Sequence, residues 1–188
     1  KTDGLAAGKG VVVTESLTEA RNAVGDYLSG QAFGDAGRTV VIEEGMVGPE
    51  LSVLAVCDGQ RAVLLTPAQD FKRVGDGDAG PNTGGMGAYT PLPWAPEGLV
   101  EAIMARVVDP TVAEMARRGT PFAGLLYAGL ALTSHGLRVV EFNCRFGDPE
   151  TQAVLAMLDS PLGQVLDAAA SVRREHDDDR RPRLPAQL

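Results

Sequence analysis

The stretch VVEFNCRFGDPETQ, residues 139–152, decides how the fold is interpreted. If its first half is an extended strand, successive side chains alternate between the two faces of that strand. Glu141, Asn143 and Arg145 then lie side by side on one face. Phe142 points to the other face, and we expect it in the core. A strand that carries an acid, an amide and a guanidinium in a row predicts that one face of its sheet lines a binding site.

The same stretch offers ligands for a hard metal ion. Glu141 and Asn143 present oxygen atoms two residues apart, and Mg²⁺ prefers such oxygens together with waters and nucleotide phosphates. A lone pair of this kind is more often the solvated face of an edge strand. Here Arg145 continues the face, and Asp148 followed by Pro149 predicts a capped helix whose N-terminus attracts an anion. This clustering favours a site for a metal ion and an anion.

Composition narrows the class of protein and its partners. The chain has 188 residues, of which 44% are apolar and 22% charged, as is typical of a folded domain with a core. Its net charge of −8, without a dense basic cluster, argues against nucleic acid and against an anionic membrane. Cys57 and Cys144 make neither a disulfide framework nor a zinc motif, which predicts a reducing, cytoplasmic setting. Cys144 shares its strand face with Phe142. No apolar run is long enough to span a membrane.

Patterns along the chain predict helices mixed with antiparallel hairpins. Ser16 and Glu19 form a capping box that opens a helix. A second helix is expected over 97–118, kinked by Pro110, and a third begins at Asp148. Turn signals separate the expected strands, which are 11–14, 39–44, 51–57, 61–67, 124–133 and 137–143. The mixed order with adjacent hairpins predicts an α+β fold with largely antiparallel sheet.

Two segments are rich in glycine. The first, KTDGLAAGKGVVV at 1–13, resembles a Walker loop but has the wrong glycine spacing and no Ser or Thr after Lys9. It is either a flap whose amides and lysines contact phosphate or an ordinary glycine-rich hairpin. The second, 75–87, has six glycines in its sequence and is expected to be a long loop.

Five stretches, taken in order, resemble the ATP-grasp domain of the glycinamide ribonucleotide synthetases (phosphoribosylamine–glycine ligases). They are KTDGLAAGKGVVV, VIEEGMVGPELSV, QDFKRVGDGDAGPNTGGMGAY, GLLYAGL and EFNCRFGDPETQ. The third and fifth are specific to this family, whereas the first two suit ATP-grasp enzymes generally. The resemblance implies two lobes with a nucleotide cleft between them. The small lobe would span 1–42 and the large lobe 43–175, and 176–188 would be a linker toward a missing C-terminal domain. An N-terminal domain would also be missing.

The resemblance also implies roles for individual residues. ATP would contact the flap, the adenine hinge and a ribose-binding acid, namely Lys1, Gly8, Lys9, Gly10, Glu43, Glu44, Met46 and Glu50. Mg²⁺ or Mn²⁺ would be held by Glu141 and Asn143. The sites for 5-phosphoribosylamine and glycine would comprise Asp70, Lys72, Arg73, Asn82, Thr83, Gly84, Gly85, Met86, Gly87, Pro149, Glu150, Thr151 and Gln152. Arg145 and Asp148 would act at the reacting centre.

The implied reaction needs no nucleophilic side chain. ATP converts the carboxylate of glycine into an acyl phosphate, and the amine of phosphoribosylamine displaces the phosphate, so catalysis is positioning plus charge neutralisation. Two departures matter: Gly45 stands where the hinge is expected to carry a bulky apolar residue, and strand 125–132 carries no second acid for a metal. The alternatives are another ATP-grasp carboxylate–amine ligase or a nucleotide-binding fragment without catalysis. The fragment alone is expected to be inactive if it needs the missing domains.

Overall fold

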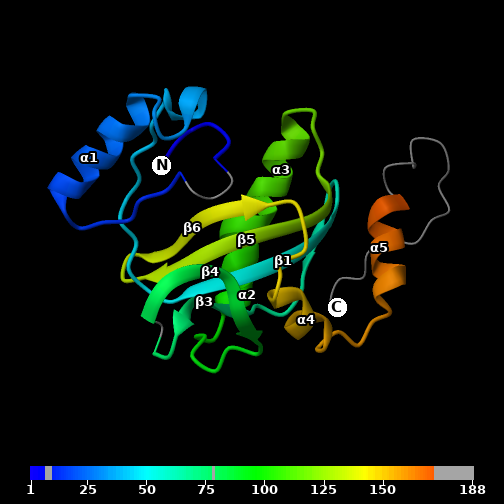
Figure 1. The fold of residues 1–188 in the computed structure, drawn as a ribbon. Helices are drawn as coiled ribbons and strands as arrows, with labels where there is room; N and C mark the ends of the chain where they lie inside the picture. The colour runs from blue at the N-terminus through cyan, green and yellow to red at the C-terminus, as the bar shows by residue number, and fades with distance from the viewer. Residues whose placement is uncertain (7–9, 78, 172–188) are drawn as a thin grey trace. The chain divides into compact units, whose positions relative to one another are not determined.

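The computed structural model of the chain describes residues 1–6, 10–77 and 79–171, and of residues 81 and 82 the backbone only. The chain divides into two compact units, Lys1–Val47 and the part from Gly48 onward (Figure 1). Helices and antiparallel sheets confirm the α+β class. The lobe boundaries at 42/43 and the cleft between the lobes stay predictions, and 176–188 lies outside the described residues. None of the described helices is long and apolar enough to cross a lipid bilayer.

The first unit contains one long helix, α1 (Leu17–Leu28), and a 3₁₀ turn, η1 (Gly34–Gly37). The backbone N–H of Glu19 donates to Ser16 Oγ at 3.3 Å, so the predicted N-cap is confirmed. The reciprocal half of the capping box is absent, because the Glu19 carboxylate accepts a 2.6 Å bond from Thr14 Oγ1 instead.

The two strands predicted in the first unit are wrong. Within its described residues, pairing is limited to an isolated bridge between Thr2 and Val40. Lys1 and Val41 exchange backbone hydrogen bonds, and the Asp3 N–H donates to the Thr39 carbonyl. A strand needs a continued ladder of such bonds, and this contact does not extend along 39–44, nor does 11–14 form a strand. Their apolar side chains are correspondingly open to solvent: Val13 is 86% and Ile42 is 84% exposed.

The second unit is organised by a four-stranded antiparallel sheet in the order β2-β1-β5-β6. Both predicted hairpins are confirmed, since β1 pairs with β2 and β5 pairs with β6. At the first turn the Asp58 carboxylate accepts the N–H groups of Gln60 and Arg61 at 2.9 and 2.7 Å. The strands are β1 (Glu50–Asp58), β2 (Ala62–Leu64), β5 (Ala123–Thr133) and β6 (Gly136–Asn143).

Helices cover both faces of this sheet. One face packs on the segment formed by α2 (Leu99–Ile103), the π-helical η2 (Met104–Val108) and α3 (Asp109–Arg117), which crosses behind the strands in Figure 1. The other face packs in part on α4 (Glu150–Leu155) and α5 (Leu162–Ser171). Alternating residues of β1 and β5 therefore enter two separate cores.

The long helix predicted over 97–118 forms as the consecutive segments α2, η2 and α3, and the kink predicted at Pro110 stays a prediction. Because Pro110 has no N–H, the chain cannot complete the α-helical bond at that position. The π turn of η2 lies immediately before it and accommodates the missing bond.

The predicted loop at 75–87 is wrong, because most of it is strand. β3 (Gln69–Gly75) and β4 (Ala79–Tyr89) form a separate antiparallel ribbon with two register shifts. Glycine content misled the prediction: glycines weaken a strand but also permit the bulges that this ribbon contains.

The prediction that Phe142 lies in the core is also wrong. Phe142 pairs with Ala128, a core residue on the α2–α3 face, so the predicted alternation holds. Phe142 is nevertheless 43% exposed, and Cys144, just beyond the strand, is exposed as well. β6 is an edge strand, and the helices do not extend over its end.

Candidate functional site

Two of the predicted nucleotide residues of the first unit are tied to each other. Lys1 Nζ lies 2.7 Å from Glu43 Oε1 in a half-exposed ion pair. Gly10 is buried so tightly that a Cβ there would overlap Thr2 Oγ1. The other flap residues of the prediction, Gly8 and Lys9, lie outside the described residues.

The predicted adenine hinge, residues 43–46, is largely exposed to solvent. Glu44 is exposed and Met46 is half-buried. A Cβ added at Gly45 would meet no atom within 4 Å, so the missing side chain leaves space rather than a clash. Among its described residues, the first unit thus offers the Lys1 ammonium and a glycine-rich backbone, which are groups that suit phosphate.

In the second unit, polar residues gather on the α4–α5 face of the sheet, beyond the part that these helices cover. Ser52 of β1 pairs with Gly129 of β5, and Gly129 pairs with Glu141 of β6. The register therefore aligns three neighbouring strands at the same level. Gly129, the middle residue of the three, has no side chain and so leaves space beside Glu141, since a Cβ at this position would be 3.3 Å from Glu141 Cγ.

A β-bulge is what turns Glu141 to this face. The pairing of β5 with β6 shifts between Leu130↔Val139 and Gly129↔Glu141, which leaves Val140 as an extra residue. Without the bulge, strict alternation would put Glu141 on the face of Val139, beside the core residue Leu130. The bulge is thus a local feature that directs the candidate ligand out of the core.

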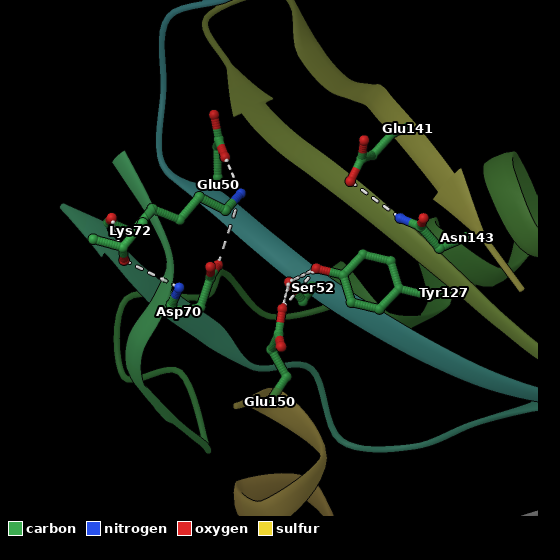
Figure 2. A network of polar contacts seen from close by, with 10 residues as sticks. Glu50, Ser52, Asp70, Lys72, Tyr127, Glu141, Asn143 and Glu150 are labelled. Atoms are coloured by element: carbon green, nitrogen blue, oxygen red, sulfur yellow. Dashed lines mark hydrogen bonds and ion pairs between the residues drawn. The ribbon is translucent and has the colours of Figure 1, made fainter. Parts of the chain in front are cut away.

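The β3–β4 ribbon brings a lysine to the edge of this face. A backbone bridge between Ser52 and Ala68 docks the start of β3 beside β1. Lys72 Nζ then lies 3.0 Å from Glu50 Oε2 and 3.9 Å from Asp70 Oδ1 (Figure 2). The prediction assigned these three residues to two different ligands, and the structure joins them through one ammonium group.

The charges around Lys72 shift two pKa values. Burial raises the pKa of the Asp70 carboxyl above its ordinary value, and the nearby Lys72 ammonium offsets this only in part. Burial lowers the pKa of Lys72, but the hydrogen bond to Glu50 and the charges of Asp70 and Glu141 outweigh it, so the net shift is upward. Lys72 therefore stays a cation at neutral pH.

Glu141 and Asn143, the predicted metal ligands, contact each other. Asn143 Nδ2 donates to Glu141 Oε1 at 3.1 Å. Among the described residues there is no cluster of three or more His, Cys, Asp or Glu side chains that could hold a metal. One carboxylate and one amide oxygen fit Mg²⁺ only in the form that keeps several waters and nucleotide phosphates as its other ligands. Asn143 must rotate its oxygen toward such an ion.

Glu150 differs from the other acids because it is buried. It is 4% exposed, and its Oε1 accepts hydrogen bonds from Tyr127 OH at 2.7 Å and Ser52 Oγ at 3.2 Å. The two hydroxyl oxygens are 2.6 Å apart. Burial and the Glu150 carboxylate raise the pKa of the Tyr127 phenol well above its ordinary value, so it remains a protonated donor.

Ser52 and Tyr127 are absent from the predicted site. The signal was present in the sequence: each is a polar side chain inside an otherwise apolar strand. Buried polar groups of this kind need partners, and in this structure they find each other and Glu150.

The segment after β6 departs from the predicted cap. α4 begins at Glu150, and its N-cap position is Pro149, without a side-chain cap. The carboxylate of Asp148 instead accepts a 2.8 Å bond from Gln152 Nε2. Arg145 lies beyond the strand, exposed, and donates to the Phe146 carbonyl at 3.0 Å. Thr151 Oγ1 is buried without a hydrogen-bond partner.

The bulged part of β4 lies against this segment. Gly85 has φ +128°, and a Cβ there would overlap Pro149 Cδ. Thr83 Oγ1 holds the bulge by donating to the Lys72 carbonyl at 2.8 Å and accepting the Gly85 N–H at 3.1 Å. Gly87 pairs with Phe71 of β3.

The other predicted residues of the ribbon have different surroundings. Gly84 and Met86 are exposed. Arg73 donates to the Gly80 carbonyl at 3.1 Å, and its backbone pairs with that of Asn82, whose side chain is not described. The ribbon thus brings its bulge to α4 and its lysine to β1.

Comparison with known proteins identifies relatives for most of the chain. Residues 1–151 match the family model described as "Phosphoribosylglycinamide synthetase, ATP-grasp (A) domain". The chain is 60% identical over 171 residues to the phosphoribosylamine–glycine ligase of Streptomyces coelicolor and 57% identical to that of Mycobacterium leprae. These matches cover 91% of this chain but 39% of each relative, so the chain spans about two fifths of their length.

Comparison with solved structures also identifies similar proteins. A phosphoribosylamine–glycine ligase from Thermotoga maritima superposes with a TM-score of 0.82 at 34% identity, covering 97% of this chain and 46% of that one. A biotin carboxylase from Campylobacter jejuni superposes with a TM-score of 0.58 at 16% identity, covering 88% of this chain and 35% of that one. The second likeness concerns the fold alone.

Proposed function

The chain belongs to the phosphoribosylglycinamide synthetase ATP-grasp (A) domain family, and from this premise we propose that it binds ATP and serves the ligation of glycine to 5-phosphoribosylamine. The products would be glycinamide ribonucleotide, ADP and phosphate, in purine biosynthesis and in the cytoplasm. The observation that carries the proposal is the polar sheet face, where Glu141 lies level with Ser52 and close to the charge of Lys72, and Asn143 follows two residues along the same strand.

The reaction requires two transfers with balanced atoms. A carboxylate oxygen of glycine attacks the γ-phosphorus of ATP, and ADP leaves. The amine nitrogen of phosphoribosylamine then attacks the acyl carbon, phosphate leaves, and the nitrogen loses a proton. In both steps the protein positions reactants and neutralises phosphate charge. The described site has lysine, arginine, carboxylates and glycines suited to this task.

Roles follow from the surroundings of each group. Lys1 would leave Glu43 to contact a nucleotide phosphate, and Lys72 would supply positive charge where the ribbon meets β1. Glu141 and Asn143 would hold Mg²⁺ or Mn²⁺, which when bound neutralises charge on the phosphates. Arg145 and Asp148 are exposed after β6 and available to the acyl phosphate and the amine.

Two measurements test the proposal at different levels. Calorimetry of this chain with Mg²⁺ and a non-hydrolysable ATP analogue tests nucleotide binding, and Glu141→Ala and Lys72→Met should weaken it. A product assay on the complete polypeptide that carries this sequence, with ATP, glycine and phosphoribosylamine, tests ligation. ATP binding without product would support a nucleotide-binding fragment, and turnover with another amine but not with phosphoribosylamine would support a different ATP-grasp ligase.

A further inference from the structure

Glu150 is a carboxylate with an unusual position for a residue of a substrate site. It is the first residue of α4, it is 4% exposed, and its Oε1 points to two hydroxyls on the central strands (Figure 2). Burying a carboxylate is costly unless hydrogen bonds compensate it. Ser52 on β1 and Tyr127 on β5 provide those bonds from two adjacent strands. A side chain held in this way faces the sheet rather than a substrate.

The backbone before α4 lies close against Glu150 and Tyr127. A Cβ at Gly147 would lie 2.6 Å from Glu150 Oε2 and 2.9 Å from Tyr127 Cε2. The chain therefore passes directly over the carboxylate and the phenol ring. From the ribbon, Gly85 closes on Pro149 with equally little room. Residues 147–150 are thus held between the sheet and the β3–β4 ribbon.

The candidate metal ligands lie on β6, which pairs with β5. Tyr127 pairs with Asn143, and Gly129, two residues along β5, pairs with Glu141. A hydrogen bond from Tyr127 to Glu150 therefore links the ligand-bearing level of the sheet to the start of α4. Asp148 and Gln152, which are joined by their own 2.8 Å bond, lie two residues on either side of Glu150.

We propose that Ser52, Tyr127 and Glu150 are positioning residues, which fix the Asp148–Gln152 segment relative to Glu141 and Asn143. The inference rests on the proposed function for the identity of the substrate, glycine, whose carboxylate that segment would orient toward the γ-phosphate. It changes the role of Glu150 from a substrate contact to an internal anchor. It also assigns a role to two hydroxyls that the predicted site did not include.

The test uses the complete polypeptide and the hydroxyl donor. Tyr127→Phe removes one hydrogen bond to Glu150 and keeps the ring that packs on Gly147. We expect kcat/KM for glycine to fall about tenfold or more, because small misplacement of a reacting group is costly. The KM for ATP should change by less than about twofold, since no nucleotide contact is removed. Tyr27→Phe is the matched control, because Tyr27 is equally buried but lies in the first unit.

A double variant separates positioning from general packing. If Tyr127 acts through Glu150, adding Tyr127→Phe to Glu150→Ala should cause no further loss, since the two changes remove one interaction. Glu150→Gln should retain more glycine kcat/KM than Glu150→Ala, because an amide oxygen still accepts from the hydroxyls. Independent losses from the two changes, or equal losses for glycine and ATP, would overturn the proposal.

Amide hydrogen exchange decides the anchoring without any turnover. In Tyr127→Phe, exchange at 147–152 should accelerate about tenfold or more while β1 and β5 stay protected. Unchanged exchange at 147–152 would overturn the anchor. If the wild-type polypeptide makes no product, the proposed function fails, and this measurement still decides whether the three residues fix the segment.

Discussion

The two faces of the central sheet show opposite uses of the same strands. On the α2–α3 face, Leu51, Val53, Leu126 and Leu130 are almost completely buried and form one continuous apolar core. On the opposite face, apolar residues continue only where α4 and α5 cover the strands, and beyond that point the face is polar. Strict alternation along β1 and β5 supplies both faces from one sequence.

The comparison shows which features specify stability and which serve a site. On the apolar face, the regular alternation of each strand accounts for which side chains are buried. The polar face departs from regular alternation and from apolar burial in three places: a bulge in β6, a glycine at position 129 and a buried carboxylate at position 150. Departures of this kind are expected where function rather than packing determines the residue.

The largest expected effect is the difference in thiol reactivity between the two cysteines. Cys57 lies in the α2–α3 core, and burial raises its pKa to about 12, whereas Cys144 is exposed at the end of β6. A thiol reagent should modify Cys144 at least about a thousandfold faster, because Cys57 reacts only after opening of the core. Mass spectrometry of a labelling time course measures both rates. Equal rates would contradict the described core.

Leu130→Ala breaks the apolar face. Leu130 is completely buried on the central strand β5, and truncation of such a residue costs about 2–5 kcal/mol of unfolding free energy. Urea denaturation measures the loss. Phe142→Ala is the comparison on the same face: because Phe142 is 43% exposed, its loss should be about 1 kcal/mol. A larger loss from Phe142→Ala would mean that the edge of β6 is covered in solution.

Glu141→Ala breaks the polar face with the reverse pattern. Its side chain is exposed, so the unfolding free energy should change by less than about 0.5 kcal/mol. Turnover of the complete polypeptide should fall about a hundredfold or more, equivalent to ~2.7 kcal/mol of barrier, if the carboxylate holds the metal ion. Glu114→Ala, an exposed acid on α3, is the control and should leave turnover unchanged. Retention of more than about a tenth of turnover by Glu141→Ala would refute the assigned role.

Much of the second unit could be predicted from sequence because its signals are local. Asp58-Gly59 specifies one turn, and the apolar alternation of β1 and β5 specifies the sheet. The first unit was less predictable. Residues 11–14 and 39–44 have the composition of strands, but a strand depends on a partner, and no local pattern reports whether a partner is present.

For the candidate site, the sequence indicated the residue types but not the contacts between them. The residue types of the metal and substrate positions were evident in EFNCRFGDPETQ, and their roles stay predictions. The connections among them were not evident, because they depend on register. The ion pair from Lys72 to Glu50 joins residues 22 apart, and the bond from Ser52 to Glu150 joins residues 98 apart. Burial of Glu150 and exposure of Phe142 follow from which elements cover each strand, which a single stretch cannot show.

Asp70, which lies on the β3–β4 ribbon beside the polar face, offers the smallest of these contrasts. Its side chain is only 6% exposed, and burial raises its pKa above the ordinary value of 3.8. A carboxyl whose pKa is raised by folding binds its proton more tightly in the folded state. Its ionisation therefore lowers stability as pH rises above 3.8, and the loss is complete once pH exceeds the folded-state pKa.

Asp70→Asn should consequently stabilise the fold at pH 7, by roughly 0.5–1 kcal/mol at the lower end of single-residue effects. Lys72 keeps Glu50 as a partner in this variant, so its own charge stays paired. The gain should shrink as pH falls and disappear below the unfolded pKa of 3.8, where both side chains are neutral. Urea titrations of both proteins at several pH values between 3 and 7 measure this difference. If Asp70→Asn destabilises the protein at pH 7 instead, attraction to Lys72 outweighs burial, and the polar face contributes to stability at this position.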